Sequence, residues 1–170
     1  RYNGTDANQD GIGDSPYIID QNNRDNYPLM GAFSNFTFPW QEQKHSITTI
    51  SNSTITNFQF DPALKKVSFN VTGETPTKSF CRITIPNIIV QEMWNNNYTV
   101  LVDNEEPLKI RNWTDGNNTF IYFTYQHSQH EVTIIPELPL NMLLPILILT
   151  TTLAIIKKKK ALNKRGLRLP

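Results

Sequence analysis

The stretch KKVSFNVT, residues 65–72, indicates the fold of this chain. Val67, Phe69 and Val71 alternate with polar residues, which is the period of a strand with one buried and one exposed face. Similar short stretches recur from Ser53 to Ile135 at intervals of roughly a dozen residues, a spacing typical of an all-β sandwich. The sequence therefore predicts a mainly β domain.

The other strand-like stretches give the expected size of that domain. They are NFQF (57–60), FCRITI (80–85), YTVLV (98–102), PLKI (107–110), TFIYFTY (119–125) and EVTII (131–135). We interpret residues 98–110 as a hairpin that turns at Asp103–Glu106. Roughly seven strands in about 80 residues predict an immunoglobulin-like antiparallel β-sandwich over residues 53–136.

The remaining residues divide into four zones by composition. Residues 1–31 are rich in Asn, Asp and Gly and read as loop, and residues 32–52 read as a polar and aromatic connector. An apolar segment over 137–156 precedes a basic tail over 157–170. The chain begins with Arg, so we expect it to be the C-terminal portion of a longer protein.

Charge and cysteine content exclude several kinds of site. The net charge is +1, but seven of the 16 basic residues lie in the last zone, which leaves the rest of the chain acidic. This distribution gives no basic surface for nucleic acid, and we expect no nucleic-acid partner. The single cysteine, Cys81, excludes an internal disulfide and reads as a buried residue of a strand.

The segment from Leu138 to Ile156 predicts a membrane anchor. It contains no charged residue, and as a helix its length would reach about 28 Å, close to the thickness of a hydrocarbon core. Four lysines, Lys157 to Lys160, follow it. Under the positive-inside rule the basic tail is cytoplasmic and the β domain is extracellular. We therefore expect a single-pass cell-membrane protein with membrane lipid as a partner.

Asn-x-Ser/Thr sequons are more frequent than composition explains. The seven candidate glycosylation sites are Asn3, Asn35, Asn52, Asn70, Asn97, Asn112 and Asn117. About three would arise by chance from the Asn, Ser and Thr content. The alternative to glycosylation is that the chain is simply rich in Asn and Thr. We interpret the excess as exposure to an N-glycosylating compartment.

The stretch DANQDGIGD, residues 6–14, matches the ligand spacing of an EF-hand-type calcium loop. The candidate metal ligands are Asp6, Asn8, Asp10, the carbonyl of Ile12 and Asp14. Gly11 stands where that loop requires glycine, but Tyr17 replaces its bidentate glutamate. The sequence leaves two alternatives open, a Ca²⁺ site and an unliganded turn stabilised by its own Asp and Asn side chains.

No catalytic constellation can be argued from the sequence. His127 and His130 are the one close histidine pair, and three-residue spacing places them on opposite faces of a strand. We interpret both as exposed residues of a turn. Four aromatic residues could form a platform for stacking sugars, although core packing explains them more simply. They are Trp94, Trp113, Tyr98 and Tyr125.

Several segments resemble parts of archaeal cell-surface proteins. YNGTDANQDGIGDSPYIIDQNNRDNYPLM, residues 2–30, resembles the final segment of NosD-like right-handed parallel β-helix proteins. NSTITNFQFDPALKKVSFNVTG, FCRITIP, YTVLVD and FIYFTYQHSQHEVTI are similar to a β module that recurs in such proteins. IPELPLNMLLPILILTTTLAIIKKKK is similar to archaeal C-terminal anchors, with Leu138 in place of a Phe. The resemblance implies that residues 1–31 end a β-helix, whose coils are associated with carbohydrate-related and copper-maturation roles.

The expected function is structural. The chain reads as a membrane-anchored, glycosylated surface protein with an adhesive or ligand-presenting role and no enzymatic activity of its own. Its expected partners are membrane lipid and cell-surface glycans or proteins. Two alternatives remain open: the chain is the C-terminal part of an enzyme that acts on surface polysaccharides, or its sandwich is a carbohydrate-binding module.

Overall fold

A computed structural model describes residues 4–137, 152–153 and 155–158 of the chain. The strands are β1 (Tyr17–Ile18), β2 (Arg24–Asp25), β3 (Ala32–Trp40), β4 (Gln43–Ser51), β5 (Thr54–Asp61), β6 (Lys66–Thr72), β7 (Lys78–Pro86), β8 (Tyr98–Val102), β9 (Lys109–Thr114), β10 (Asn118–Gln126) and β11 (Gln129–Pro136). One helix, α1 (Asn87–Trp94), separates β7 from β8.

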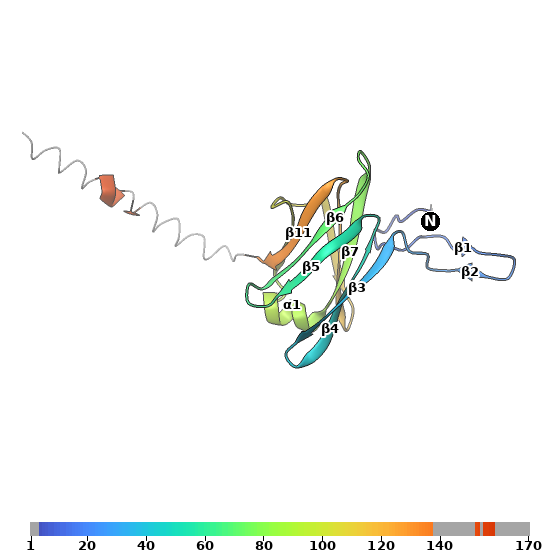
Figure 1. The fold of residues 1–170 in the computed structure, drawn as a ribbon, viewed down its shortest axis with the longest axis horizontal. Helices are drawn as coiled ribbons and strands as arrows, with labels where there is room; N and C mark the ends of the chain where they lie inside the picture. The colour runs from blue at the N-terminus through green and yellow to red at the C-terminus, as the bar shows by residue number, and fades with distance from the viewer. Residues whose placement is uncertain (1–3, 138–151, 154, 159–170) are drawn as a thin grey trace, which may run out of the picture. The chain divides into compact units, whose positions relative to one another are not determined.

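Two antiparallel sheets form the body of the fold (Figure 1). The first has the strand order β3-β4-β7-β10-β9 and the second has the order β5-β6-β11-β8. Apolar residues from both sheets form one buried cluster. The prediction of a mainly β, sandwich-like domain is therefore confirmed. Among the described residues no coil of a parallel β-helix is present, and residues 4–31 form a loop that contains the β1–β2 pair.

Alternation along the strands places the core. In β6, Val67 and Val71 are fully buried, as the sequence predicted. In β7, Cys81 and Ile83 are also fully buried, while Arg82 between them faces away from the core. Burial raises the pKa of the Cys81 thiol, which keeps it a neutral, unreactive packing residue.

The segment predicted as a connector, residues 32–52, instead forms the strands β3 and β4. Its aromatic residues explain why. The Phe36 ring stacks on Phe58 of β5 at 4.2 Å, and the Phe38 ring stacks on Phe60 at 4.0 Å. Because β3 and β5 are edge strands of different sheets, this aromatic stack closes one side of the sandwich. Burial of large rings stabilises such a strand even though its other face is polar.

The predicted hairpin over residues 98–110 is wrong. β8 pairs with β11 in one sheet, and β9 pairs with β10 in the other. The segment between them therefore crosses from sheet to sheet. Asp103 fixes the crossing, because its carboxylate accepts hydrogen bonds from the backbone N–H of Glu131 and from the His130 ring. The His130 hydrogen bond, followed by the Glu131 one, lowers the pKa of Asp103.

The helix α1 carries the chain between the sheets at the opposite end. It buries Ile89, Val90, Met93 and Trp94 against the core, and Asn95 ends it in the left-handed conformation that terminates many helices. None of the helices among the described residues is long and apolar enough to span a membrane. Most of the expected anchor over 137–156 lies outside the described residues; Thr152–Leu153 and Ile155–Lys158 are helical.

The aromatic stack generates a stability prediction. Phe58→Ala removes a ring that contacts both Phe36 and the buried Phe69, and we expect the free energy of unfolding to fall by about 2 kcal/mol because the ring is only partly buried. Denaturant unfolding of the full chain measures this. Phe33→Ala is the matched control, since Phe33 lies on the exposed face of β3, and an equal loss in both variants would contradict the assignment.

Candidate functional site

Three crossings between the sheets meet at one end of the sandwich. They join β4 to β5, β6 to β7, and β10 to β11. The strand registers place them together, because Thr72 lies opposite Thr54 on one side and opposite Gln129 on the other. Gln126 at the end of β10 lies opposite Lys78 at the start of β7. The buried polar residues of the domain gather mainly at this end.

Ser53 is the centre of a buried hydrogen-bond network that joins these crossings. Its hydroxyl accepts a hydrogen bond from the Tyr125 hydroxyl at 2.8 Å, contacts the Ser79 hydroxyl at 2.6 Å, and lies 3.0 Å from His127 Nε2. Ser53 and its three partners are each less than 10 % exposed. A hydroxyl has one donor and two acceptor positions, so the Ser53 oxygen is fully occupied.

Asn52 extends the network onto the backbone of β7. Its side-chain oxygen accepts hydrogen bonds from the backbone N–H of Phe80 and from the Ser79 hydroxyl, and its amide nitrogen donates to the carbonyl of Lys78. The amide therefore continues the sheet ladder at the point where the chain leaves β4. Ser51 adds a hydrogen bond to the Phe80 carbonyl.

His127 is buried rather than exposed, and its interpretation as an exposed turn residue is wrong. Its Nδ1 contacts the Thr77 hydroxyl, and its backbone N–H donates to the Thr77 carbonyl at 2.8 Å. Gly73 provides the space, because a Cβ there would lie 2.1 Å from His127 Cδ2. His130 is partly exposed and bonds Asp103. The two histidines therefore have separate partners and do not converge on a shared ion.

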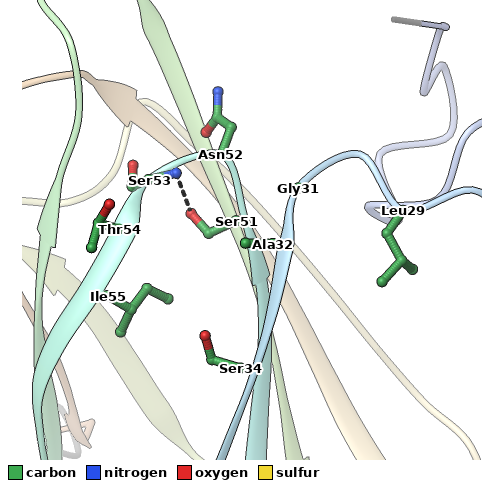
Figure 2. A pocket seen from close by; sticks show the side chains of 9 residues that line it. All are labelled: Leu29, Gly31, Ala32, Ser34, Ser51, Asn52, Ser53, Thr54 and Ile55. Carbon is green, nitrogen blue, oxygen red and sulfur yellow. Dashed lines mark hydrogen bonds between the residues drawn. The ribbon is translucent and has the colours of Figure 1, made fainter. Parts of the chain in front are cut away.

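A cavity of about 510 Å³ lies beside this network, between β3 and the start of β5 (Figure 2). Figure 2 shows the backbone N–H of Ser53 bonded to the Ser51 hydroxyl, and Asn52 turned away from the cavity. None of its described lining residues is charged. Because the Ser51 and Ser53 hydroxyls already have structural partners, the cavity offers few free polar groups to a ligand.

The predicted calcium loop is a hydrogen-bonded turn in this structure. The Asp6 carboxylate accepts the backbone N–H groups of Asp10 and Gly11, and the Asp10 carboxylate accepts that of Ile12. Asp14 accepts the N–H of Ala7, and the Asn8 amide donates to Asp10. Gly11 has φ of +80°, a conformation that glycine adopts without strain.

Two arginines hold this loop on the outer face of the first sheet. Arg82 of β7 donates to the Asp10 carbonyl at 2.8 Å and lies over the Phe120 ring. Arg111 of β9 donates to the Asn8 carbonyl. Burial lowers the pKa of Arg82, and the nearby Asp10 and Asp6 charges oppose that shift. The acidic residues thus complement a fixed positive charge on the sheet.

The carboxylates do not converge on one point. Among residues 4–137, 152–153 and 155–158 there is no group of three or more Asp, Glu, His or Cys side chains placed to hold a metal. Asp6, Asp10 and Asp14 instead direct oxygens at backbone N–H groups of their own loop. Calcium binding by this loop therefore stays a prediction.

The sequon asparagines differ in accessibility. Asn3 lies outside the described residues. Asn70 is partly buried and Asn52 is engaged with β7. The remaining four asparagines are exposed. They are Asn35 on β3, Asn97 before β8, Asn112 on β9 and Asn117 before β10.

A second cavity, of about 630 Å³, lies at the edge of the sandwich where β8, β9 and α1 meet. It is lined by Asn87, Val90, Gln91, Asn96, Tyr98, Asn112, Trp113, Thr114 and Thr119. Asn112 of β9 donates to the Tyr98 hydroxyl of β8 at 3.2 Å, so this hydrogen bond connects the two sheets. Sequence reasoning missed the cavity, because its residues come from four separate elements.

The four aromatic residues considered as a sugar platform do not form one surface. Trp94 and Tyr125 are about 3 % exposed and belong to the core. Trp113 stacks on Phe120 on the outer face of the first sheet, beneath Arg111. Tyr98 remains at the edge cavity, where burial raises the pKa of its hydroxyl. Only Trp113 and Tyr98 of the four therefore remain near a surface where a sugar could bind.

No family model, curated protein or solved structure matches this chain. The candidate sites therefore rest on the geometry and chemistry of the residues themselves.

The Ser53 network generates the next prediction. Ser53→Ala leaves the buried Tyr125, Ser79 and His127 groups without a shared partner, and we expect the free energy of unfolding to fall by about 3 kcal/mol. Urea denaturation of the full chain in detergent measures it. Thr54→Ala alters the adjacent exposed hydroxyl and should change stability by less than about 0.5 kcal/mol. Equal losses of unfolding free energy in Ser53→Ala and Thr54→Ala would show that the Ser53 network stabilises the fold no more than an exposed hydroxyl does.

The calcium prediction has a direct test. If the loop binds Ca²⁺, millimolar Ca²⁺ raises the melting temperature of the full chain, and Asp14→Asn abolishes the increase because it removes a ligand charge. The amide oxygen of the substituted side chain can still accept the Ala7 N–H, so the variant separates ion binding from turn formation. Mg²⁺ is the control ion. If Ca²⁺ leaves the melting temperature unchanged, the calcium prediction is contradicted and the loop is a hydrogen-bonded turn without an ion.

Proposed function

We propose that this chain is a membrane-anchored, glycosylated cell-surface protein whose β-sandwich has a structural or adhesive role. The observation that carries the proposal is the exposure of four sequon asparagines on the sandwich: Asn35, Asn97, Asn112 and Asn117. Attached sugars there would extend into solvent without disturbing the core. The uncharged segment before Lys157 supports an anchor, and the lysines support a cytoplasmic tail.

The interior of the domain agrees with a structural role. Its buried polar groups are bonded mainly to one another, as around Ser53. Hydrogen-bonded buried networks of this kind favour one rigid arrangement of a core. We also propose an immunoglobulin-like description of the sandwich, supported by its two antiparallel sheets and several crossings.

The resemblance to archaeal surface proteins adds a role for the loop over residues 4–31. We infer that this loop belongs to the segment, residues 1–31, that ends a β-helix next to the sandwich. The Arg82 and Arg111 hydrogen bonds support the inference, because they attach the loop to the sheet by its backbone. A calcium ion, if the titration finds one, would brace the same junction.

Two other functions remain as alternatives. An enzyme that acts on surface polysaccharide would need catalytic residues upstream, and a carboxylate cluster repeated along one face of a β-helix would favour it. A carbohydrate-binding module is favoured by one observation, the uncharged edge cavity that includes Tyr98 and Asn112. Loss of glycan-array binding on Tyr98→Ala would support that alternative.

One experiment tests the proposal. The full chain is expressed in an N-glycosylating host, its membranes are washed with carbonate, and the glycopeptides are mapped by mass spectrometry. We expect the chain in the washed membranes, with sugars on Asn35, Asn97, Asn112 and Asn117. Asn52 should stay unmodified because its amide is bonded to β7.

Each half of that experiment can fail separately. Recovery of the intact chain in the soluble fraction would contradict the anchor. Absence of sugars from every sequon would contradict the proposal that the chain is glycosylated. Replacement of all four lysines, Lys157 to Lys160, by Gln tests the orientation signal while the apolar segment over 137–156 is retained.

A further inference from the structure

The two open sides of the sandwich are closed by different chemistry. At the β3–β5 side, stacked rings of Phe36, Phe38, Phe58 and Phe60 exclude water. At the β8–β9 side, one hydrogen bond from Asn112 to Tyr98 joins the sheets. Ile110, two residues before Asn112 and on the same face of β9, is 50 % exposed. The β8–β9 side therefore lacks the cover that the β3–β5 side has.

The edge cavity on that side has the chemistry of a site for a neutral polyhydroxylated group. None of its described lining residues carries a charge, so the cavity offers no charged partner to an ion. The Gln91 and Asn96 side chains have no hydrogen-bond partner among the described residues. Planar amides and a tyrosine hydroxyl can donate to and accept from sugar hydroxyls, while Val90 and Tyr98 supply apolar contact.

The cavity volume suits a small ligand. A volume of about 630 Å³ lies within the usual range for small-molecule sites. Asn87 and Thr119 are already bonded to each other at 2.8 Å, so they form a fixed wall rather than free ligand groups. The open amides lie on α1 and on the turn after it.

A glycan on Asn112 would start at this cavity, because Asn112 is both a sequon asparagine and a lining residue. Its amide nitrogen carries two hydrogens. Glycosylation replaces one of them, and the other can still donate to the Tyr98 hydroxyl. The first sugars of an Asn112 glycan would therefore start at the cavity while the inter-sheet hydrogen bond is kept.

Because the glycan is covalently linked to Asn112, the cavity can bind it without a high intrinsic affinity. A group held by a short flexible link has an effective concentration in the millimolar range, so a dissociation constant of roughly 1 mM gives about half occupancy. Two free amides and one aromatic ring can supply affinity of that order. A free sugar at micromolar concentration would leave the same cavity empty.

We propose that the edge cavity between β8, β9 and α1 binds the N-linked glycan of Asn112, and that this sugar covers the open side of the sandwich. The proposal rests on the glycosylation in the proposed function and adds a defined intramolecular site for one glycan. The Asn112 sugar then covers the β8–β9 side of the sandwich, as the aromatic rings cover the β3–β5 side.

The test compares variants of the full chain from glycosylating and non-glycosylating hosts. Thr114→Ala removes the sequon and leaves the Asn112–Tyr98 hydrogen bond, whereas Thr114→Ser keeps the sequon. We expect Thr114→Ala to lower the melting temperature by roughly 3 °C in the glycosylated protein and to leave it unchanged in the non-glycosylated one. Thr37→Ala, which removes the sugar of the exposed Asn35, should change neither form.

A second variant checks the cavity itself. Gln91→Ala keeps the Asn112 glycan but removes a proposed partner, and we expect it to speed enzymatic release of that glycan from the folded protein while release from Asn35 is unchanged. If no sequon is modified, the proposed glycoprotein fails as well. If other sequons are modified and Asn112 is not, or if its sugar alters neither melting nor release rate, only this inference is overturned.

Discussion

The structure depends on holding the chain where it passes from one sheet to the other. Each crossing interrupts the ladder of both sheets, so its backbone and polar side chains need other partners. At one end, Ser53 bonds to His127, and both Ser53 and Asn52 bond to β7. At the other end α1 makes the crossing with its own hydrogen bonds and buried apolar face. Between these fixed ends, apolar residues of both sheets pack into one buried cluster.

The interactions that are local in sequence could be predicted. The alternation in β6 and β7 is a property of adjacent residues, and both strands lie where it indicates. Phe36, Phe38 and Trp40 alternate in β3 in the same way, but the polar residues around them led us to interpret residues 32–52 as a connector. The pairing of β8 and β9 was not predictable from the turn between them, because Asp103 bonds to residues of β11, 27 and 28 positions away.

The sites depended still more on distant partners. His127 reads as exposed until Ser53, 74 positions away, and Thr77, 50 positions away, are brought to its ring. The Asp-rich loop has the spacing of a cation site, and its carboxylates also accept N–H groups of the same loop. Its spacing is compatible with both alternatives, and a spacing alone does not distinguish an ion from a turn. The edge cavity has no sequence signal, since four elements contribute to it.

The places where the chain enters and leaves the sandwich have a mechanical consequence. β3 begins at Ala32 opposite Ser51, at the end with the Ser53 network, whereas β11 finishes at Pro136 opposite Tyr98, at the end with α1. Tension applied between these two points runs parallel to the strands. It must slide either β3 along β4 or β11 between β6 and β8, and either movement strains many ladder hydrogen bonds at once instead of opening them one by one. A domain connected in this way resists stretching as a stiff link.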